Sequence, residues 1–517
     1  MPTYLSPGVY VEEVEAGTRP IEGVGTSVAA FVGLAAKGPV NEPTLVSNWT
    51  QYAETFGDFT ENAYLAHAVY GWFLNGGGNC FVVRIEPSGG RGGAAKPKEI
   101  TPPKRAQIGG YTATSIAKGA TAGKTIGVVV EPAGGENPPG ETFRLVVTVD
   151  GKDTETYDNV TAQPGDNNVA VAVNAASKLI NLEETSSGSA LAVATAGQAV
   201  LAEQEPVPVP PSVDNLGAGD YVGDAAQRTG FSGLEAVDEV TMVSVPDLAA
   251  AYEQGAIDLE TFKAVQLGMI AHCELMGDRI AILDTPPGLN PQQVHEWRTR
   301  GAGYDSRFAT MYWPWVKVFD PASSTNKFVP PSGHMAGVWA RNDDTRGVHK
   351  APANEVVRGA ISLQTQITKA EHDLLNPVGI NCIRTFPGRG VRVWGARTLS
   401  SDAEWRYLNV RRLFNYLEES ILLGTQWVVF EPNDPALWAR IRRTIASFLI
   451  NEWRKGALFG TTPDEAFFVK CDDETNPAEG IDAGQVVCQI GVAPVKPAEF
   501  VIFQLSQFSG GTSLVNE

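Results

Sequence analysis

The strongest constraint on the fold lies near the carboxyl end, where helix and strand signals follow one another without a break from residue 391 to residue 495. Ser401–Glu404 has the Ser-x-x-Glu pattern of a capping box, which predicts that a helix begins there. The helix is expected to end at Gly424, which suits a left-handed stop. Between them an apolar stripe recurs at three- and four-residue spacing. Its members are Val410, Leu413, Phe414, Leu417 and Ile421.

A second helix is predicted between Asp434 and Gly456, because Asp and the following Pro435 are favoured at a cap and at the first helical position. Its apolar stripe comprises Leu437, Ile441, Ile445, Phe448 and Leu449. Trp427–Phe430, between the two helices, predicts a buried strand. Three later runs are also typical of strands, namely residues 467–471, 485–495 and 500–508. This order of elements favours a compact α+β domain.

Strands and helices alternate in two earlier parts of the chain. Apolar runs at 27–40 and 80–85 flank a helical stretch at 64–74, and a second series begins after residue 236. In that series strands are expected at 237–245, 280–283 and 311–315, with helices at 259–274 and 291–300. Such alternation predicts a parallel α/β sheet.

Residues 91–235 differ in character, and we interpret them as an inserted, variable, mostly β domain that faces outward. Asp150-Gly151 suits a tight primed turn and predicts a hairpin of residues 143–149 and 154–160. Gly119–Thr125 imitates a phosphate-binding loop. However, three residues rather than four separate its glycines, and no strand leads into it, so nucleotide binding there is a weak hypothesis.

Extended segments with apolar side chains lie near both ends of the chain. At the amino end Val9 and Val11 alternate with Tyr10 and Glu12, followed by Glu13. The carboxyl-terminal segment contains Phe500, Val501, Ile502, Phe503 and Leu505. An isolated strand exposes unpaired backbone groups and an aggregation-prone edge, so each segment is expected to join a sheet, either in its own domain or in another subunit.

Composition excludes some classes of protein. A net charge of −19 argues against a general nucleic-acid binder. The 5 cysteines are scattered and form no CxxC pair, which indicates reduced, mostly buried thiols in a cytosolic setting. No cationic leader opens the chain, and the longest early apolar run, residues 28–36, is too short to span a membrane. We therefore expect the protein to be made and kept in the cytoplasm, without direct membrane insertion.

Five spaced motifs carry a family resemblance. They are YLSPGVYVEE at 4–13, PSGHMAG at 331–337, NPVGIN at 376–381, VWGARTLS at 393–400 and FEPN at 430–433. With them the chain resembles the sheath proteins of contractile phage tails and of phage-tail-like contractile injection systems. The resemblance covers about the first ninety residues and everything after about residue 236.

The resemblance implies a multidomain α/β and α+β fold whose α/β domain is subtilisin-like and catalytically dead. The expected parts are an extended arm (1–22), the first part of the α/β core (23–90), the β-rich insert (91–235), the subtilisin-like sheath domain (236–380), the α+β carboxyl-terminal domain (381–497) and a terminal strand arm (498–517).

The function implied by the resemblance is mechanical. Hexameric rings of this subunit would stack into a helical sheath around an inner tube protein, in contact with baseplate and tail terminator or cap proteins, and contraction would drive the tube through a target envelope. The terminal arms would complete a sheet in a neighbouring subunit. Between Arg384 and Lys455 there are more Lys and Arg than Asp and Glu, whereas residues 1–22 hold four Glu and one Arg. These opposite charges either steer arm docking or belong to solvated faces. The alternative is another self-assembling ring or helical protein with strand-exchanging arms.

An enzymatic interpretation depends on two segments that resemble subtilisin-type proteases. The strand that ends at Asp284 resembles the one that carries the catalytic aspartate, and His334 resembles a position in the helix after the nucleophile. The nucleophile position, five residues before His334, is Val329, and none of the six histidines precedes a glycine. Two of the three triad members are therefore missing at the matching positions. We expect no catalytic residue, no cofactor and no metal site, with Asp284 and His334 as cap or packing residues.

Overall fold

The computed structural model describes most of the chain and divides it into two compact units. One unit comprises residues 1–91 and 210–517, and the other residues 92–209. The described residues are 20–60, 62–87, 104–108, 111–116, 125–134, 142–163, 165, 167–184, 198–201, 213 and 216–504. The terminal segment 9–13, Leu505 and most of the loop Gly119–Thr125 lie outside the described residues.

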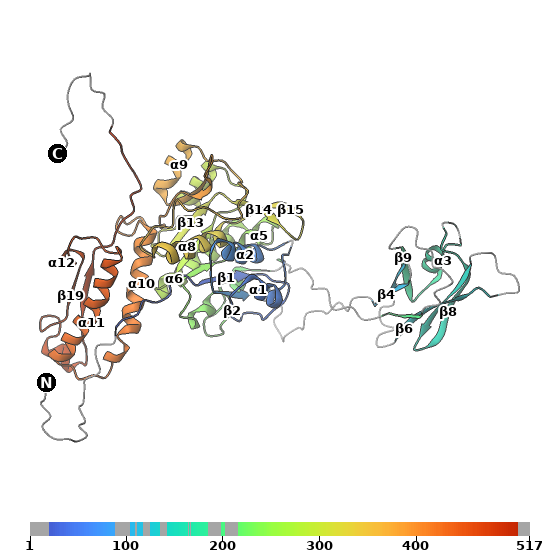
Figure 1. Ribbon diagram of the computed structural model, residues 1–517, viewed down its shortest axis with the longest axis horizontal. Helices are drawn as coiled ribbons and strands as arrows, with labels where there is room; N and C mark the ends of the chain where they lie inside the picture. The colour runs from blue at the N-terminus through green and yellow to red at the C-terminus, as the bar shows by residue number, and fades with distance from the viewer. Residues whose placement is uncertain are drawn as a thin grey trace, which may run out of the picture. The chain divides into compact units, whose positions relative to one another are not determined.

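The larger unit is built on an eight-stranded sheet (Figure 1). In spatial order its strands are β18 (Gly390–Val393), β17 (Ile380–Phe386), β13 (Ala309–Trp313), β12 (Ile280–Asp284), β11 (Met242–Ser244), β1 (Ala29–Gly33), β3 (Cys80–Arg84) and β2 (Thr44–Val46). The six central strands are mutually parallel, and the two edge strands are antiparallel to their neighbours. The predicted parallel α/β sheet is therefore confirmed.

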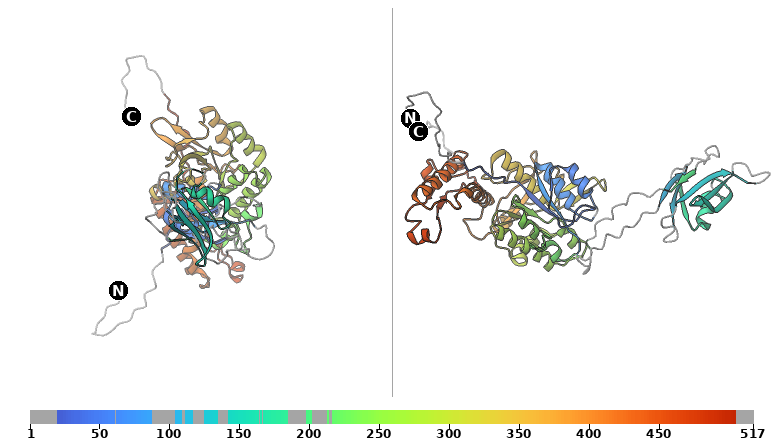
Figure 2. Two further views of the ribbon diagram at one scale, coloured as in Figure 1. Left: turned by 90° about the vertical axis from the view of Figure 1, so that its right-hand side faces the viewer. Right: turned by 90° about the horizontal axis from the view of Figure 1, so that it is seen from below.

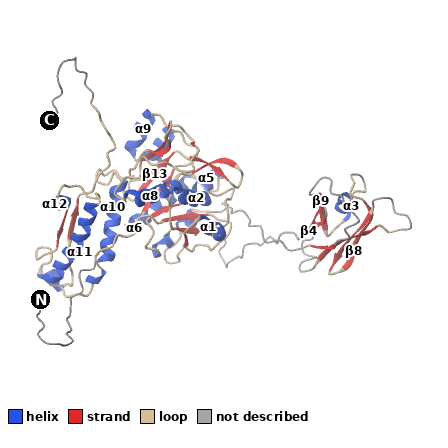
Figure 3. Cartoon of the chain, in the orientation of Figure 1, coloured by secondary structure: helices blue, strands red, loops and turns tan. Residues whose placement is uncertain are grey.

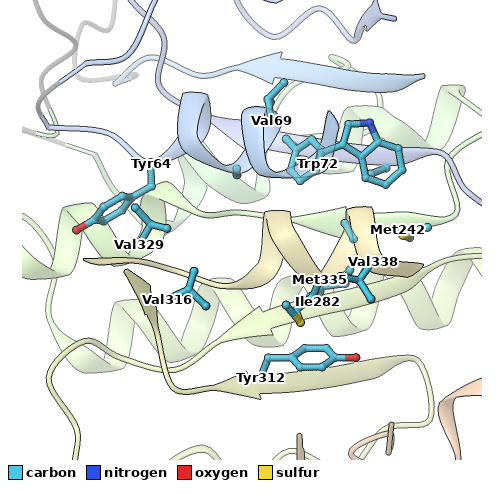
Figure 4. Close-up of a cluster of buried hydrophobic side chains, with 14 of the residues drawn as sticks. Tyr64, Val69, Trp72, Met242, Ile282, Tyr312, Val316, Val329, Met335 and Val338 are labelled. Atoms are coloured by element: carbon cyan, nitrogen blue, oxygen red, sulfur yellow. The ribbon is translucent and has the colours of Figure 1, made fainter. Parts of the chain in front are cut away.

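Alternate residues of each central strand enter two separate cores, as the two-residue period of a strand dictates. One face of the sheet, with Phe31 and Ile282, packs against α1 (Trp49–Phe56), α2 (Leu65–Asn75) and α8 (Ser332–Arg346). The opposite face, with Val32 and Leu283, packs against α4 (Ala218–Val222), α5 (Asp247–Glu253) and α6 (Leu259–Met276). Figure 4 shows the first core, where Trp72 on α2 and Met335 on α8 lie over the sheet.

Glycines let α2 and α8 approach each other closely. A Cβ added to Gly333 would lie 2.3 Å from the Cα atom of Ala68, and one added to Gly337 would lie 2.5 Å from the carbonyl oxygen of Trp72. Both contacts involve backbone atoms, which cannot move aside easily. The glycines of the PSGHMAG motif therefore serve helix packing.

The carboxyl-terminal part of this unit consists of two long helices, α10 (Leu408–Gly424) and α11 (Pro435–Arg454), and a two-stranded antiparallel sheet of β19 (Phe467–Lys470) and β20 (Gln489–Val492) (Figure 3). Asp434 caps α11 by accepting the backbone N–H of Leu437 at 2.7 Å, as predicted. Leu437, Ile441 and Phe448 are buried against α10 residues and the sheet.

Two local predictions in this region are wrong. The helix begins at Leu408 rather than at Ser401, because Ser401 donates both its backbone N–H and its hydroxyl to Asp305 instead of capping a helix. Trp427–Phe430 is not a buried strand. It overlaps the 3₁₀ turn η4 (Gln426–Val428), whose backbone bonds are local, and Phe430 is 102% exposed with a positive φ of 68°.

In its described residues the smaller unit contains two antiparallel sheets and one helix, shown in green-blue in Figure 2. Its elements are β4 (Arg105–Ile108), β5 (Tyr111–Ser115), β6 (Ile126–Pro132), β7 (Phe143–Val149), β8 (Lys152–Val160), α3 (Val169–Ala176), β9 (Ile180–Glu184) and β10 (Gln198–Val200). The predicted β7–β8 hairpin is present, with positive φ at Asp150 and Gly151. The unit ends at Val209 rather than at residue 235, because Tyr221, Phe231 and Leu234 are buried in the core of the larger unit.

Shorter elements complete the larger unit. They are η1 (Ser232–Ala236), α7 (Pro291–Glu296), the π-helical turn η2 (Trp297–Ala302), β14 (Val316–Asp320), β15 (Thr325–Val329), β16 (Ser362–Leu363), α9 (Lys369–Leu375), η3 (Asn376–Val378), α12 (Pro463–Ala466) and α13 (Ala478–Asp482). Strands β15, β14 and β16 form a separate three-stranded sheet.

Candidate assembly site

The position that resembles a protease active site is part of the packed interior. Asp284 ends β12 and is 6% exposed. Its carboxylate accepts the Ser332 backbone N–H at 2.9 Å and the Ser332 hydroxyl at 2.5 Å, so it holds the first turn of α8. Burial raises the pKa of Asp284 to about 7 against the opposing effect of these bonds. Val329, at the end of β15, is buried in the same core.

His334 is a packing residue on α8. Its ring lies against α2, where a Cβ at Gly71 would be 2.6 Å from Nδ1. Burial, together with the nearby His67, lowers the pKa of His334 to about 4. His67 itself lies 3.4 Å from Asp320, measured from Nε2 to Oδ1. The positions of Asp284 and His334 agree with the cap and packing roles expected from the sequence.

The NPVGIN and VWGARTLS motifs meet near the amino-terminal ends of strands β17 and β13. The Asn381 side chain, on β17, accepts the backbone N–H of Arg397 at 2.7 Å and donates to the Arg397 carbonyl at 2.8 Å. Thr310 on β13 also donates its hydroxyl to that carbonyl, at 2.9 Å. These bonds fix the backbone of Arg397 and therefore the base of its side chain.

Arg397 anchors the start of the carboxyl-terminal arm. Its guanidinium makes a two-pronged contact with the carboxylate of Glu499, with Nε at 2.9 Å from Oε1. Asn376 donates to the same Oε1 at 2.9 Å, and Tyr407 donates to Oε2 at 3.4 Å. Burial raises the pKa of Glu499, but the bonds from Arg397 and Asn376 outweigh it and hold that pKa below its ordinary value. The arm is thus fixed at Glu499.

Beyond this anchor the apolar side chains are largely exposed. Phe500, Val501, Ile502 and Phe503 are 74%, 67%, 82% and 84% exposed and have no regular secondary structure in the single chain. Four consecutive exposed apolar side chains are unusual in a soluble monomer. Strand formation by this segment stays a prediction, since it requires a partner.

The β19–β20 sheet has backbone groups available on both outer edges. Ala493 donates its N–H to the Ala466 carbonyl at 2.8 Å. Because hydrogen-bonded and non-hydrogen-bonded pairs alternate along an antiparallel ladder, this bond shows which pairs of β19 and β20 are of each kind. The N–H and C=O groups of Phe467 and Val469 then point away from β20, and those of Ile490 and Val492 point away from β19. Among the residues the structure describes, the Phe467 N–H donates to the Pro463 carbonyl at the start of β19, whereas no backbone bond reaches the outward groups of Val469, Ile490 and Val492. Each edge can therefore accept a further strand.

A basic groove follows the outer edge of β19. It is lined by Ala439, Arg442, Arg443, Ala446, Asp464, Phe467, Phe468 and Val469. Two arginines of α11 thus lie along this edge, where Arg442 donates to the Cys471 carbonyl, whereas the arm at the amino end of the chain carries Glu12, Glu13 and Glu15. The sequence indicated the charge difference but not the groove that concentrates it.

Two kinds of feature are absent from the described residues. No cluster of three or more His, Cys, Asp or Glu residues there has a geometry that could hold a metal ion. Within the same described ranges, no helix is both long and apolar enough to cross a lipid bilayer.

Open sheet edges and an exposed apolar arm in the same chain are typical of a subunit that assembles through strand exchange. Residues 217–399 match the phage tail sheath protein central domain, and residues 400–508 match the phage tail sheath C-terminal domain, together more than half of the chain. The chain therefore belongs to the phage tail sheath family. It is a structural subunit of a contractile tail sheath, part of a phage tail or a tail-like particle.

Individual relatives agree with this assignment. The tail sheath protein of Burkholderia phage BcepMu is 25% identical over 96% of this chain and 95% of its own length. The tail sheath protein of Vibrio phage KVP40 is 30% identical, over 35% of this chain and only 27% of its own length. The fold is shared with the sheath of an extracellular contractile injection system, PVC, in its contracted state, with a TM-score of 0.59 and 23% identity over 98% of this chain and 99% of that one.

Proposed function

We propose that this subunit polymerises by exchanging both terminal arms with neighbouring copies, and that the arms complete the β19–β20 sheet. The observation that carries the proposal is the pair of open edges on a two-stranded sheet. A two-stranded ribbon is marginally stable alone, and added strands extend its backbone ladder and its apolar face. Stacked rings linked in this way could slide and rotate without separating.

Charge favours a particular edge for each arm. The arm at residues 9–15, with its three glutamates, is matched to the β19 edge, where Arg442 and Arg443 line the groove. The arm at Phe500–Leu505 carries no charge and is assigned to the β20 edge, beside exposed Ile490 and Val487. In the alternative, the arms fold onto their own subunit, and assembly would then not depend on these charges.

The remaining partners follow from the family. We infer that the sheath surrounds an inner tube protein, is nucleated on a baseplate and is closed by a terminator, after assembly in the bacterial cytoplasm. Contraction would draw its energy from new contacts between subunits and drive the tube through a target envelope. The α/β unit would serve as a subtilisin-like scaffold without the protease triad, since Asp284 bonds directly to Ser332 and Val329 is buried.

Charge reversal tests the arm assignment. Replacing Glu12, Glu13 and Glu15 by Lys is expected to reduce sedimentable polymer at least tenfold at low salt, and further replacement of Arg442 and Arg443 by Glu should restore it. The matched control changes three exposed acidic residues of the smaller unit to Lys, namely Glu131, Asp153 and Glu183. Equal polymer yield and equal salt dependence in all variants would contradict the assignment.

A further inference from the structure

Two of the five cysteines lie opposite each other at one end of the β19–β20 sheet. The last paired residues of the ladder are Lys470 and Gln489. Cys471 directly follows Lys470 and Cys488 directly precedes Gln489, so continuing the ladder by one step places the two cysteines across from each other. The sequence separates them by sixteen residues and gives no CxxC signal.

The alternation of the ladder places this pair at a favourable position for a covalent link. Ala466 and Ala493 form a hydrogen-bonded pair, so Phe468–Gly491 and Lys470–Gln489 do as well. Cys471 and Cys488 then occupy a non-hydrogen-bonded position, where opposite Cα atoms are about 4.5 Å apart. Disulfides span Cα separations of roughly 4.4–6.8 Å. The strands therefore need not move apart or slide for a bond to form.

The side chains around the pair hold it in place. The two thiols are hydrogen-bonded to each other, which together with burial raises the pKa of Cys488 to about 12. Asn476, 4% exposed, contacts the Cys471 sulfur at 3.8 Å, donates to the Val487 carbonyl at 3.1 Å and accepts the Val487 N–H at 2.7 Å. It thereby ties the residue before Cys488 to Cys471 itself.

We propose that Cys471 and Cys488 form an intrachain disulfide when the particle meets an oxidising disulfide such as oxidised glutathione. The half-exposed Cys488 loses its proton and attacks the oxidant, one glutathione thiolate leaves, and Cys471 then displaces the second. One S–S bond forms in the protein, one breaks in the oxidant, and two glutathione thiols are released. Cellular reductants keep such thiols reduced, so the bond would form after release from the cytoplasm.

The disulfide would close residues 472–487 into a loop and fix the register of β19 against β20. A consequence for the polymer rests on the proposed function, because this sheet is the one assigned to the arms. The sheet with a fixed register would hold docked arms more firmly, and oxidised polymer should dissociate more slowly in urea than reduced polymer. Formation of the bond itself depends only on the observed ladder.

The test uses the full chain, incubated with oxidised glutathione at pH 8, unfolded without reductant and assayed for free thiols and for disulfide-linked peptides. The expected result is a fall from five free thiols to three, with one peptide pair joining Cys471 to Cys488. Cys80, Cys273 and Cys382, each fully buried, serve as internal controls that stay reduced. Five remaining thiols, or glutathione attached to Cys488 without the cross-link, would overturn the proposal.

A Cys488→Ser variant completes the experiment. It should form no intrachain link, and its polymer should show the same urea resistance with and without oxidant, whereas oxidised wild-type polymer resists urea longer. A cross-link with unchanged urea resistance would retain the disulfide and reject its consequence for the arms. Failure of the reduced wild-type chain to polymerise at all would count against the proposed function instead.

Discussion

The central α/β sheet and the β19–β20 sheet are built in opposite ways. The central sheet ends in antiparallel edge strands, buries both faces under helices and keeps large side chains such as Trp72 and Trp339 fully enclosed. The β19–β20 sheet has two strands, two open edges and exposed Phe468 and Ile490. The first region is complete in a single chain, while the second is the one that, under the proposed arm exchange, other copies would complete. Mutations should therefore affect stability in one region and assembly in the other.

The largest effect on stability is expected from Trp72→Ala. Trp72 is 0% exposed, lies edge-on to Phe31 and donates to the Gly78 carbonyl at 3.1 Å. Loss of a buried indole costs about 3–5 kcal/mol of unfolding free energy. Phe503→Ala is the matched control, since this ring is 84% exposed and should change stability by less than about 0.5 kcal/mol while reducing polymer yield. Urea unfolding followed by circular dichroism measures both, and equal costs would remove the distinction between the regions.

Glu499→Ala should release the arm at its base. It leaves the guanidinium of Arg397, only 10% exposed, without its carboxylate, at a cost of about 1–3 kcal/mol. Hydrogen exchange at Val495, whose N–H donates to the Ala457 carbonyl just before the anchor, should quicken by up to roughly tenfold, because 1.4 kcal/mol corresponds to a factor of ten. Glu474→Ala, which breaks the exposed pair with Lys470, should have little effect. Unchanged exchange after Glu499→Ala would show that the anchor does not hold the arm.

The contact between Arg397 and Glu499 could not be predicted from the sequence. Apolar periodicity, helix caps and turn residues predicted the parallel sheet, α11 and the β7–β8 hairpin, because each of these elements is determined by residues close together in the sequence. Glu499 and Arg397 are about a hundred residues apart, and the Cys471–Cys488 pair requires the ladder register, so neither had a local signal. The capping box at Ser401 failed for the same reason, since Asp305 competes for its donors from a distant loop. Phe430 was predicted as buried from its apolarity alone, although no strand lies beside it.

Acid should destabilise the α/β region through its buried histidines. Burial lowers the pKa of His67, His272 and His334 to about 4, from 6.5. As the pH falls from about 6.5 to about 4 the unfolded chain takes up protons that the folded chain does not, so stability is lost over that range. Buried Asp247 and Asp284, with raised pKa values, act in the opposite direction. No histidine follows His372, so the β19–β20 region lacks this sensitivity.

His334→Gln isolates one of these contributions. Between pH 7 and pH 5 the variant should lose about 1–2 kcal/mol less unfolding free energy than the wild-type chain, because one fewer buried imidazole resists protonation. Urea midpoints at the two pH values measure the difference. Identical losses in both proteins would mean that His334 takes up its proton in the folded state.

The smallest effect is expected at Phe430, which is fully exposed at a left-handed φ of 68°. Phe430→Gly should stabilise the single chain by about 0.5–1 kcal/mol, since glycine adopts this conformation without strain. Phe430→Ala keeps the strain and should change stability by less than about 0.5 kcal/mol. Thermal unfolding of the two variants checks this, and a loss of stability in the glycine variant would indicate a contact that holds the ring.

The most direct test of strand exchange compares the full chain with a chain that ends at Glu499, which keeps the bond to Arg397 and removes the exposed apolar segment. Both proteins would be purified and imaged by negative-stain electron microscopy. The account predicts striated tubes from the full chain and only dispersed subunits, with unchanged thermal unfolding, from the truncated one. Tubes of equal length and number from both chains would contradict the claim that the carboxyl-terminal arm completes the sheet of a neighbour.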